Sequence, residues 1–276
     1  MQLRYLFFFI LVVNQAYPQQ NKYNFIIQNK ANERLPFASL YWPRSAGFSA
    51  NNEGVISITS DSPIDSIIVS SIGYKTIQTN ISSLQKSNDS IVVVLTPQES
   101  ILPSVTIFSK TNETDLGIQE RQTSFISNNY RSLTGVVKIY QPNKICKIKS
   151  VSIFINKKSA ENIPFRIRIF AITESGYPGE DLLRDNIVIE SYSIGEWNTF
   201  YLGDSNIFIE HPFFFIGIEW LNQPQIKTKG NLQIGLTTKI NEAQTYFQFA
   251  NREWRIHRYI NQPVAENLMI KTKVLF

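Results

Sequence analysis

The chain has 276 residues, of which 43% are apolar, and it carries a formal charge of +5. This length suffices for one large domain or two ordinary ones, and the apolar content excludes a chain that is disordered throughout. Residues 121–276 hold nineteen Lys and Arg against thirteen Asp and Glu, so the basic excess belongs to the second half. No run of five basic residues occurs there, which argues against a nucleic-acid-binding protein.

The first 20 residues are typical of a secretory signal peptide. Arg4 supplies the positive end, and Tyr5–Val13 is an unbroken apolar run of nine residues. A helix of this length rises about 14 Å, well short of the roughly 30 Å hydrocarbon core of a membrane. We therefore expect residues 1–20 to be cleaved and the protein to be exported, to the periplasm, the outer-membrane surface or the extracellular space. No later segment reaches 18 apolar residues, so no transmembrane segment is expected in the mature chain.

Residues 22–108 show strand patterns separated by turn residues. Short apolar runs recur at a spacing of about ten residues. The expected strands are Phe25–Ile27, Phe37–Trp42, Val55–Thr59, Ile67–Val69, Tyr74–Ile77 and Ile91–Leu95. Asn51–Gly54 is turn chemistry, because Asn and Gly tolerate positive φ. The pattern predicts a small antiparallel β-sandwich.

Four motifs of this stretch occur in a recognisable order: Leu35-Pro-Phe-Ala38, Asn52-Glu-Gly54, Ser71-Ile-Gly-Tyr74 and Val92-Val-Val-Leu95. With them, residues 22–108 resemble the carboxypeptidase-regulatory-like domain found in envelope proteins of Bacteroidota-type bacteria, and Ile101–Ile107 is similar to its closing strand. The sequence departs from the family in two places. The Gly that usually opens the first strand is missing, and Phe48–Asn51 replaces the residues that usually lead into the turn. The resemblance implies a transthyretin-like sandwich without catalytic activity.

Residues 109–122 are polar and lack periodicity, so we interpret them as a linker to a second domain over residues 123–276. There Phe165, Ile167 and Ile169 alternate with Arg166 and Arg168, which predicts one buried face and one wet face. Further expected elements are a central strand at Phe213–Trp220, a hairpin over Tyr246–Ile256 and a final strand over Leu268–Phe276. The loop Gly176–Gly179, the turn Gly195–Trp197 and the strand end Gly217–Trp220 resemble an arrangement found in secreted jelly-roll domains. The predicted fold class is all-β, with a jelly-roll-like second sandwich as the candidate ligand-binding domain.

Little in the sequence indicates metal or covalent chemistry. Cys146 is the single cysteine, which excludes an intrachain disulfide and a cysteine-based metal site, and we interpret it as a half-buried small hydrophobe. The two histidines, His211 and His257, stand outside any zinc-peptidase motif. No phosphate loop or dinucleotide fingerprint occurs, so no metal, cofactor or catalytic residue is predicted.

A glycosidase needs only two carboxylates, and Glu196, Glu210, Glu219 and Glu253 all lie near aromatic residues. Glu219 is the sharpest candidate, because its place between Ile218 and Trp220 could raise its pKa. The favoured alternative is a structural carboxylate at a strand end that reaches an Arg or solvent.

Aromatic residues offer the better binding candidates. Trp197, Trp220, Trp254, Tyr246 and Tyr259 could form a platform for a sugar ring, although Trp at a strand position is more often core. Trp197 and Trp254 have polar neighbours and are the expected exceptions, so the ligand-binding candidates are Trp197, Trp254, Tyr246 and Tyr259.

These observations lead to one hypothesis and two alternatives. The leading hypothesis is a non-catalytic exported envelope protein that binds a glycan or a protein partner. The first alternative is a glycoside hydrolase that uses carboxylates of the second domain. The second is a structural component of the envelope.

Overall fold

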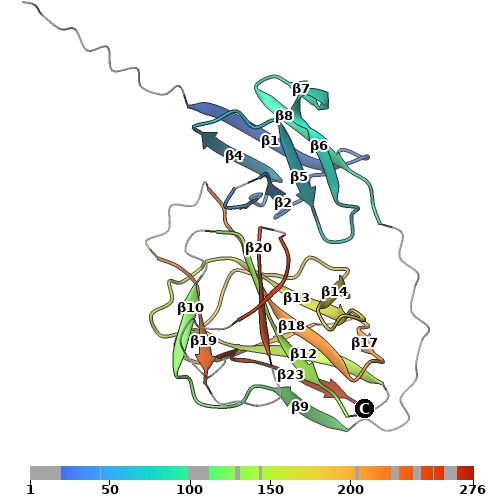
Figure 1. Ribbon diagram of the computed structural model, residues 1–276, viewed down its shortest axis with the longest axis vertical. Helices are drawn as coiled ribbons and strands as arrows, with labels where there is room; N and C mark the ends of the chain where they lie inside the picture. The colour runs from blue at the N-terminus through green and yellow to red at the C-terminus, as the bar shows by residue number, and fades with distance from the viewer. Residues whose placement is uncertain are drawn as a thin grey trace, which may run out of the picture.

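A computed structural model describes residues 20–43, 45–98, 112–127, 131–142, 145–202, 205–224, 230–238, 244–250, 252–257 and 266–276. These residues form two β-sandwiches, one above the other in Figure 1, and the predicted all-β class is confirmed. Their one helical element is a 3-10 turn at Ile81–Ser83, and no helix among them is long and apolar enough to cross a membrane. The predicted signal peptide, apart from Gln20, and the predicted closing strand Ile101–Ile107 lie outside the described residues.

The first sandwich consists of two four-stranded sheets, ordered β4-β1-β8-β7 and β3-β2-β5-β6. Their strands are β1 (Asn21–Asn29), β2 (Ser39–Tyr41), β3 (Phe48–Ser49), β4 (Val55–Ser60), β5 (Ser66–Ser70), β6 (Ile77–Asn80), β7 (Gln85–Ser87) and β8 (Ser90–Leu95). The expected purely antiparallel arrangement is wrong for β1 and β8, which run parallel with Phe25 opposite Ile91. A parallel pair requires a crossover connection, and the rest of the sandwich provides it.

The predicted turn at Asn51–Gly54 has a clear physical basis. The side-chain oxygen of Asn51 accepts hydrogen bonds from the backbone of Glu53 and Val55 at 3.0 and 2.9 Å. Gly54 has φ of +70°, and a Cβ there would lie 2.9 Å from the carbonyl oxygen of Ile27. The turn therefore brings β4 back against β1, and alternate residues of both strands face the core between the sheets.

The second sandwich has a seven-stranded sheet with the order β14-β13-β18-β11-β20-β21, to which β15 adds beside β13. Its strands are β11 (Leu133–Tyr140), β13 (Phe165–Ile172), β14 (Pro178–Asp181), β15 (Val188–Ile189), β18 (Phe213–Trp220), β20 (Thr245–Phe249) and β21 (Arg255–Ile256). The strand β18 is central, as expected, and β20 and β21 form the expected hairpin with Tyr246 opposite Ile256.

A five-stranded sheet with the order β16-β12-β23-β9, plus β17 beside β12, lies opposite. A three-stranded sheet β10-β19-β22 adjoins it through a bridge between Ile155 and Ile234. The strands of both are β9 (Glu113–Gly117), β10 (Ser124–Ser127), β12 (Cys146–Phe154), β16 (Trp197–Tyr201), β17 (Phe208–Ile209), β19 (Gln233–Thr237), β22 (Asn267–Leu268) and β23 (Ile270–Leu275). Part of the predicted linker thus belongs to this sandwich, because β9 pairs with β23 and Ile118 is buried.

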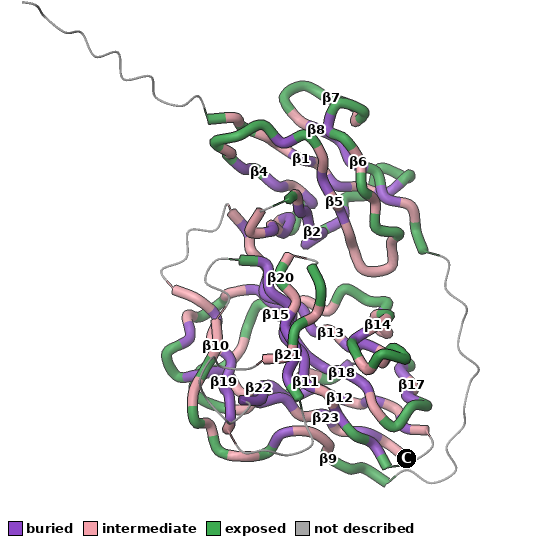
Figure 2. The backbone as a smooth tube through the Cα atoms, viewed as in Figure 1, coloured by how far each residue is buried: buried purple, intermediate pink, exposed green. Residues whose placement is uncertain are grey.

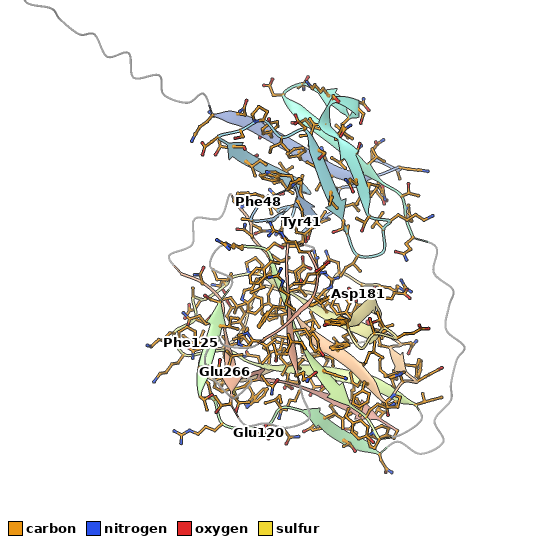
Figure 3. All side chains as sticks on the ribbon, viewed as in Figure 1. Tyr41, Phe48, Glu120, Phe125, Asp181 and Glu266 are labelled. Carbon is orange, nitrogen blue, oxygen red and sulfur yellow. The ribbon has the colours of Figure 1, made fainter. Side chains whose placement is uncertain are left out.

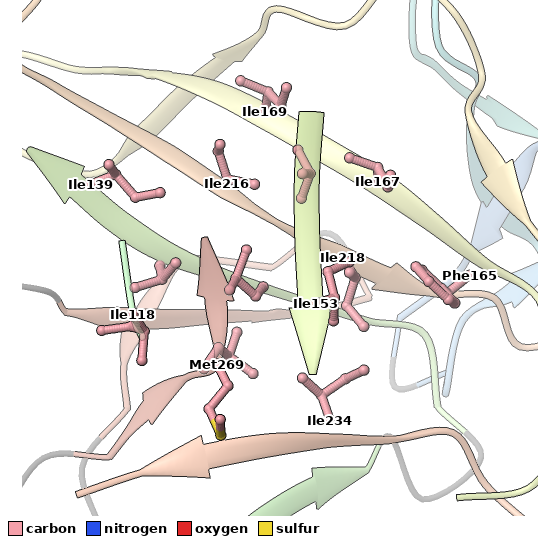
Figure 4. Close-up of a cluster of buried hydrophobic side chains, with 14 of the residues drawn as sticks. Ile118, Ile139, Ile153, Phe165, Ile167, Ile169, Ile216, Ile218, Ile234 and Met269 are labelled. Carbon is pink, nitrogen blue, oxygen red and sulfur yellow. The ribbon is translucent and has the colours of Figure 1, made fainter. Parts of the chain in front are cut away.

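The main core fills the space between these sheets and is rich in isoleucine (Figure 4). Cys146 is fully buried in it rather than half-buried, and burial raises the pKa of its thiol to about 12. A smaller cluster of Val136, Phe170, Phe215 and Tyr246 lies on the other face of the seven-stranded sheet. That sheet is therefore apolar on both faces near its centre, and Figure 2 shows its buried strands passing beneath the first sandwich.

Candidate functional site

The junction between the sandwiches encloses a cluster of four charged side chains: Arg166, Arg168, Asp181 and Glu219. The Nη1 of Arg166 lies 2.8 Å from the Oε2 of Glu219, and both side chains are almost fully buried. Arg168 also contacts Oε2 of Glu219, and its Nε lies 2.6 Å from Oδ2 of Asp181. The face of β13 that carries Arg166 and Arg168 was expected to be exposed to solvent. It is covered instead, because the first sandwich packs over it.

The first sandwich completes the hydrogen bonding of this charge cluster. The hydroxyl of Ser39 donates to Oε1 of Glu219 at 3.0 Å, and Arg166 donates to the backbone carbonyl of Phe37. Figure 3 labels Tyr41 and Asp181 on the two sides of the junction. Outside the cluster, the side chains of Asn222 and Gln223 donate to the carbonyls of Gly47 and Ala50 at 2.7 and 2.8 Å. Buried charges are tolerated when their partners are all in place, and here the partners come from both sandwiches.

The electrostatics of Glu219 oppose a catalytic role for it. Burial alone would raise its pKa, but the charges of Arg166 and Arg168 outweigh burial and lower the pKa to about 2. The raised pKa considered for Glu219 therefore does not agree with its surroundings, whereas the favoured interpretation, a structural carboxylate that reaches an Arg, agrees with the geometry. A general acid needs a pKa near the working pH, and this carboxylate stays ionised.

The lowered pKa makes the contribution of Glu219 to stability dependent on pH. Because its folded pKa lies below its ordinary value of 4.5, its stabilisation is complete above pH 4.5 and is lost as the pH falls through about 2. The difference in unfolding free energy between wild type and Glu219→Gln should therefore shrink across this window, as measured by urea unfolding. Asp181, whose pKa burial raises, is present in both proteins, so its opposite contribution largely cancels. A difference that stays constant down to pH 2 would contradict the assignment.

The other candidate carboxylates are not assembled with Glu219. Glu196, Glu210 and Glu253 are exposed. Glu210 lies before the first residue of β18, whereas Glu219 is next to its last residue. Because an eight-residue strand spans about 25 Å, the two carboxylates are at opposite ends of the strand. Among the described residues, no group of three or more His, Cys, Asp and Glu side chains could hold a metal ion.

A second feature is the outward face of the five-stranded sheet, which carries Trp197. Residues directly paired across antiparallel strands share a face of the sheet, so the register places the side chains. Tyr201 and Lys273 flank Ser150, while Thr199 and Lys271 flank Ser152. Trp197 lies opposite Phe154. Aromatic side chains thus line one side of this face, lysines line the other, and small serines lie between them.

Trp197 is half-buried: it packs against the edge of the main core, and contacts on this face hold its ring. The ring of Phe154 meets it edge-on at 5.7 Å, and the Nζ of Lys271 lies 5.0 Å from the Trp197 ring centroid. Tyr201 is 72% exposed, the most exposed large hydrophobic side chain among the described residues. We call the residues Trp197, Tyr201, Lys271 and Lys273 the tryptophan face.

The remaining aromatic candidates are elsewhere. Tyr246 is only 4% exposed, and its ring packs edge-on against Phe215 at 5.3 Å. Trp254 is half-buried and packs edge-on against Phe170 in the same cluster. Trp220 is core, and its indole nitrogen donates to the carbonyl of Leu232 at 3.1 Å. The single platform considered from the sequence is therefore not formed by these residues, and Tyr259 lies outside the described residues.

Comparisons with known proteins found only distant structural likenesses. No family model matches the chain, and no curated protein matches it. It is similar to the cysteine protease and lectin-like domains of Cwp84, a surface-layer-associated protein of Clostridium difficile, with 14% identity and a TM-score of 0.44 over 59% of this chain and 35% of that chain. It is also similar to BcpA, the major pilin subunit of Bacillus cereus, with 10% identity and a TM-score of 0.19 over 86% of this chain and 67% of that chain. Likenesses this distant carry no argument about function.

Proposed function

We propose that the protein is a non-catalytic, exported envelope protein of the Bacteroidota type that binds a glycan through the tryptophan face. The observation that carries the proposal is the half-buried Trp197, whose ring is held by Phe154 and Lys271 on the outward face of the sheet. An aromatic ring offers its flat apolar face to the C–H groups of a sugar, and it is held by packing before the ligand arrives. The proposed export rests on the N-terminal segment, Arg4 followed by Tyr5–Val13.

The proposal of binding rather than hydrolysis is supported by the state of Glu219. Both of its carboxylate oxygens already have partners, with Ser39 on Oε1 and two arginines on Oε2. The tryptophan face offers hydroxyls, amines and aromatic rings, which suit recognition of a polar ligand. Its acidic neighbour Glu113 is already paired with Lys149 and Lys273.

A glycan array probed with the wild-type protein tests this proposal. Each aromatic contact contributes about 1 kcal/mol, so loss of both aromatic rings of the face should weaken binding about tenfold or more. We therefore expect Trp197→Ala and Tyr201→Ala each to lower the array signal and the double variant to abolish it. Tyr140→Ala, which removes an exposed tyrosine from the other sheet, is the matched control.

Three results would count against the glycan. If the wild type binds no glycan but captures envelope proteins, and the same two variants fail to capture them, the partner is a protein. Turnover of a glycan that is lost on a Glu→Gln change in a folded variant would favour the hydrolase. Neither signal, with a folded wild-type protein, would favour a structural component.

A further inference from the structure

A groove of about 520 Å³ lies at the edge of the junction, away from the tryptophan face. The first sandwich contributes Ser45 and Ala46, and the second contributes Arg131 and Ser132 together with residues at the ends of β20 and β21. Phe249 is the last residue of β20, Ala250, Arg252 and Glu253 follow it, and β21 adds Arg255. A volume of this size falls within the range of about 300–1,000 Å³ typical of ligand sites.

Backbone hydrogen bonds fix the walls of this arginine groove. The amide of Ser132 donates to the carbonyl of Ala46 at 2.8 Å, which ties one sandwich to the other. The amide of Ala250 donates to the carbonyl of Ser132 at 3.1 Å, and that of Arg252 donates to Phe249 at 2.9 Å. The side-chain amide of Gln248 adds a hydrogen bond to the carbonyl of Arg252 at 2.8 Å. The groove is therefore preorganised, which lowers the entropic cost of binding.

The lining of the groove is basic and carries one exposed aromatic ring. Three arginines face a single carboxylate, that of Glu253. Neither Arg252 nor Arg255 forms an ion pair with an acidic side chain among the described residues. A guanidinium group matches the two oxygens of a carboxylate or a sulfate in a planar fork. Phe249, 42% exposed, adds a flat apolar surface beside these cations.

This combination indicates a sugar polymer rather than a peptide. An extended peptide would add to a sheet edge through unpaired backbone groups. The backbone groups of Ser132, Ala250 and Arg252 that line the groove already bond to one another and to neighbouring residues. The remaining means of recognition are the guanidinium groups and the Phe249 ring, which suit a pyranose that carries an anionic substituent.

We propose that the arginine groove is a binding site for an acidic polysaccharide, recognised through its carboxylate or sulfate groups. This site is separate from the tryptophan face, and the inference stands whether or not that face binds a glycan. Arg252 and Arg255 hold the anionic substituents, and Phe249 packs against the sugar ring. Because both sandwiches contribute walls, the site exists only while they are docked.

Calorimetric titration of the full-length mature protein tests this inference. The probes are polygalacturonate for carboxylates, chondroitin sulfate for sulfates, and dextran as the neutral polymer. We expect binding to at least one polyanion and none to dextran, with an affinity that falls as salt rises. Arg252→Gln/Arg255→Gln should weaken that binding about tenfold or more, since two charge-assisted contacts are lost. Phe249→Ala should weaken it less.

The matched control is Lys157→Gln/Lys158→Gln, which removes the same charge from an exposed turn outside the groove. Equal loss in this control would overturn the site, because binding would then reflect net charge. Absence of binding to both polyanions would overturn it as well. If polyglutamate or a single-stranded oligonucleotide binds as tightly as the polysaccharides, the assignment of an acidic polysaccharide as the ligand class would be overturned. The side chains of Arg252, Arg255 and Phe249 are exposed, so the variants should fold, and circular dichroism verifies this. Variants of Trp197 and Tyr201 should leave polyanion binding unchanged, which separates this site from the tryptophan face.

Discussion

Replacing Glu219 with alanine is expected to lower the free energy of unfolding by about 3 to 5 kcal/mol, the cost of breaking a buried ion pair. The substitution leaves the Arg166 guanidinium, 2% exposed, without a carboxylate at the junction. Arg168 keeps Asp181, but Ser39 loses the acceptor of its hydroxyl. Most of the loss is therefore the cost of burying a cation whose anion has gone.

Urea unfolding of the wild type and the variant measures this loss. Glu113→Ala is the control, because its ion pairs with Lys149 and Lys273 are exposed and such pairs contribute little. We expect no measurable change from it. A second variant, Arg166→Met/Glu219→Leu, removes both charges and should recover much of the stability lost in Glu219→Ala. A Glu219→Ala loss no larger than that of Glu113→Ala would show that the charge cluster does not stabilise the junction.

Gly217→Ala is expected to cost about 3 kcal/mol, the upper end of the usual cost of overfilling a core. Gly217 lies in β18 between β11 and β13, opposite Val136 and Arg168. A Cβ there would lie 1.9 Å from the carbonyl oxygen of Gly135, and the obstacle is backbone that cannot rotate aside. The two strands would have to separate at the centre of the sheet.

Gly176→Ala is the comparison for this prediction. Gly176 has φ of +83° with no atom within 4 Å of its added Cβ, so the substitution tests backbone conformation without crowding. A left-handed residue other than glycine costs about 1 to 2 kcal/mol. We expect thermal and urea unfolding to show a larger loss for Gly217→Ala than for Gly176→Ala. The reverse order would mean that the central strands adjust to the methyl group.

Local patterns in the sequence were sufficient for the strands and the fold class. Apolar and charged residues alternate in Phe165–Ile169, and Phe213–Trp220 is a nearly continuous apolar run. In each case the pattern within one strand indicates which side chains are buried in the core. The hairpin of β20 and β21 followed from two aromatic strands around a short turn. Such features depend on near neighbours in the chain, so they are visible without knowledge of the tertiary fold.

The junction could not be predicted in the same way. Arg166 and Arg168 have the spacing of a solvent-facing row, and only the docking of a distant segment around Ser39 buries them. The parallel pairing of β1 and β8 likewise depends on the whole sandwich between them. One signal was present: an acidic residue in an otherwise apolar strand, Glu219, requires a cation nearby, and Arg166 and Arg168 were candidates.

Among the binding candidates, Trp197 and Tyr246 show why composition alone was ambiguous. Both are aromatic residues at strand positions, and the sequence distinguishes them only by polar neighbours. Tyr246 is covered because Tyr177 and Phe215 close over its ring, at 5.7 and 5.3 Å between centroids. Those contacts come from other strands and a loop, so no local rule could have identified them.

The hydrogen bond from Arg166 to the backbone carbonyl of Phe37 constrains how the two sandwiches can evolve. The buried charges all belong to the second sandwich, and the first supplies two of their hydrogen-bond partners, Ser39 and the carbonyl of Phe37, so the second sandwich is not an interchangeable module. Beneath an unrelated first sandwich, Arg166 and Glu219 would keep their ion pair, but each would lose one hydrogen-bond partner unless the new neighbour supplied an acceptor and a donor. Substitutions at Ser39 and Glu219 should accordingly be inherited together, and the two sandwiches should descend as one unit.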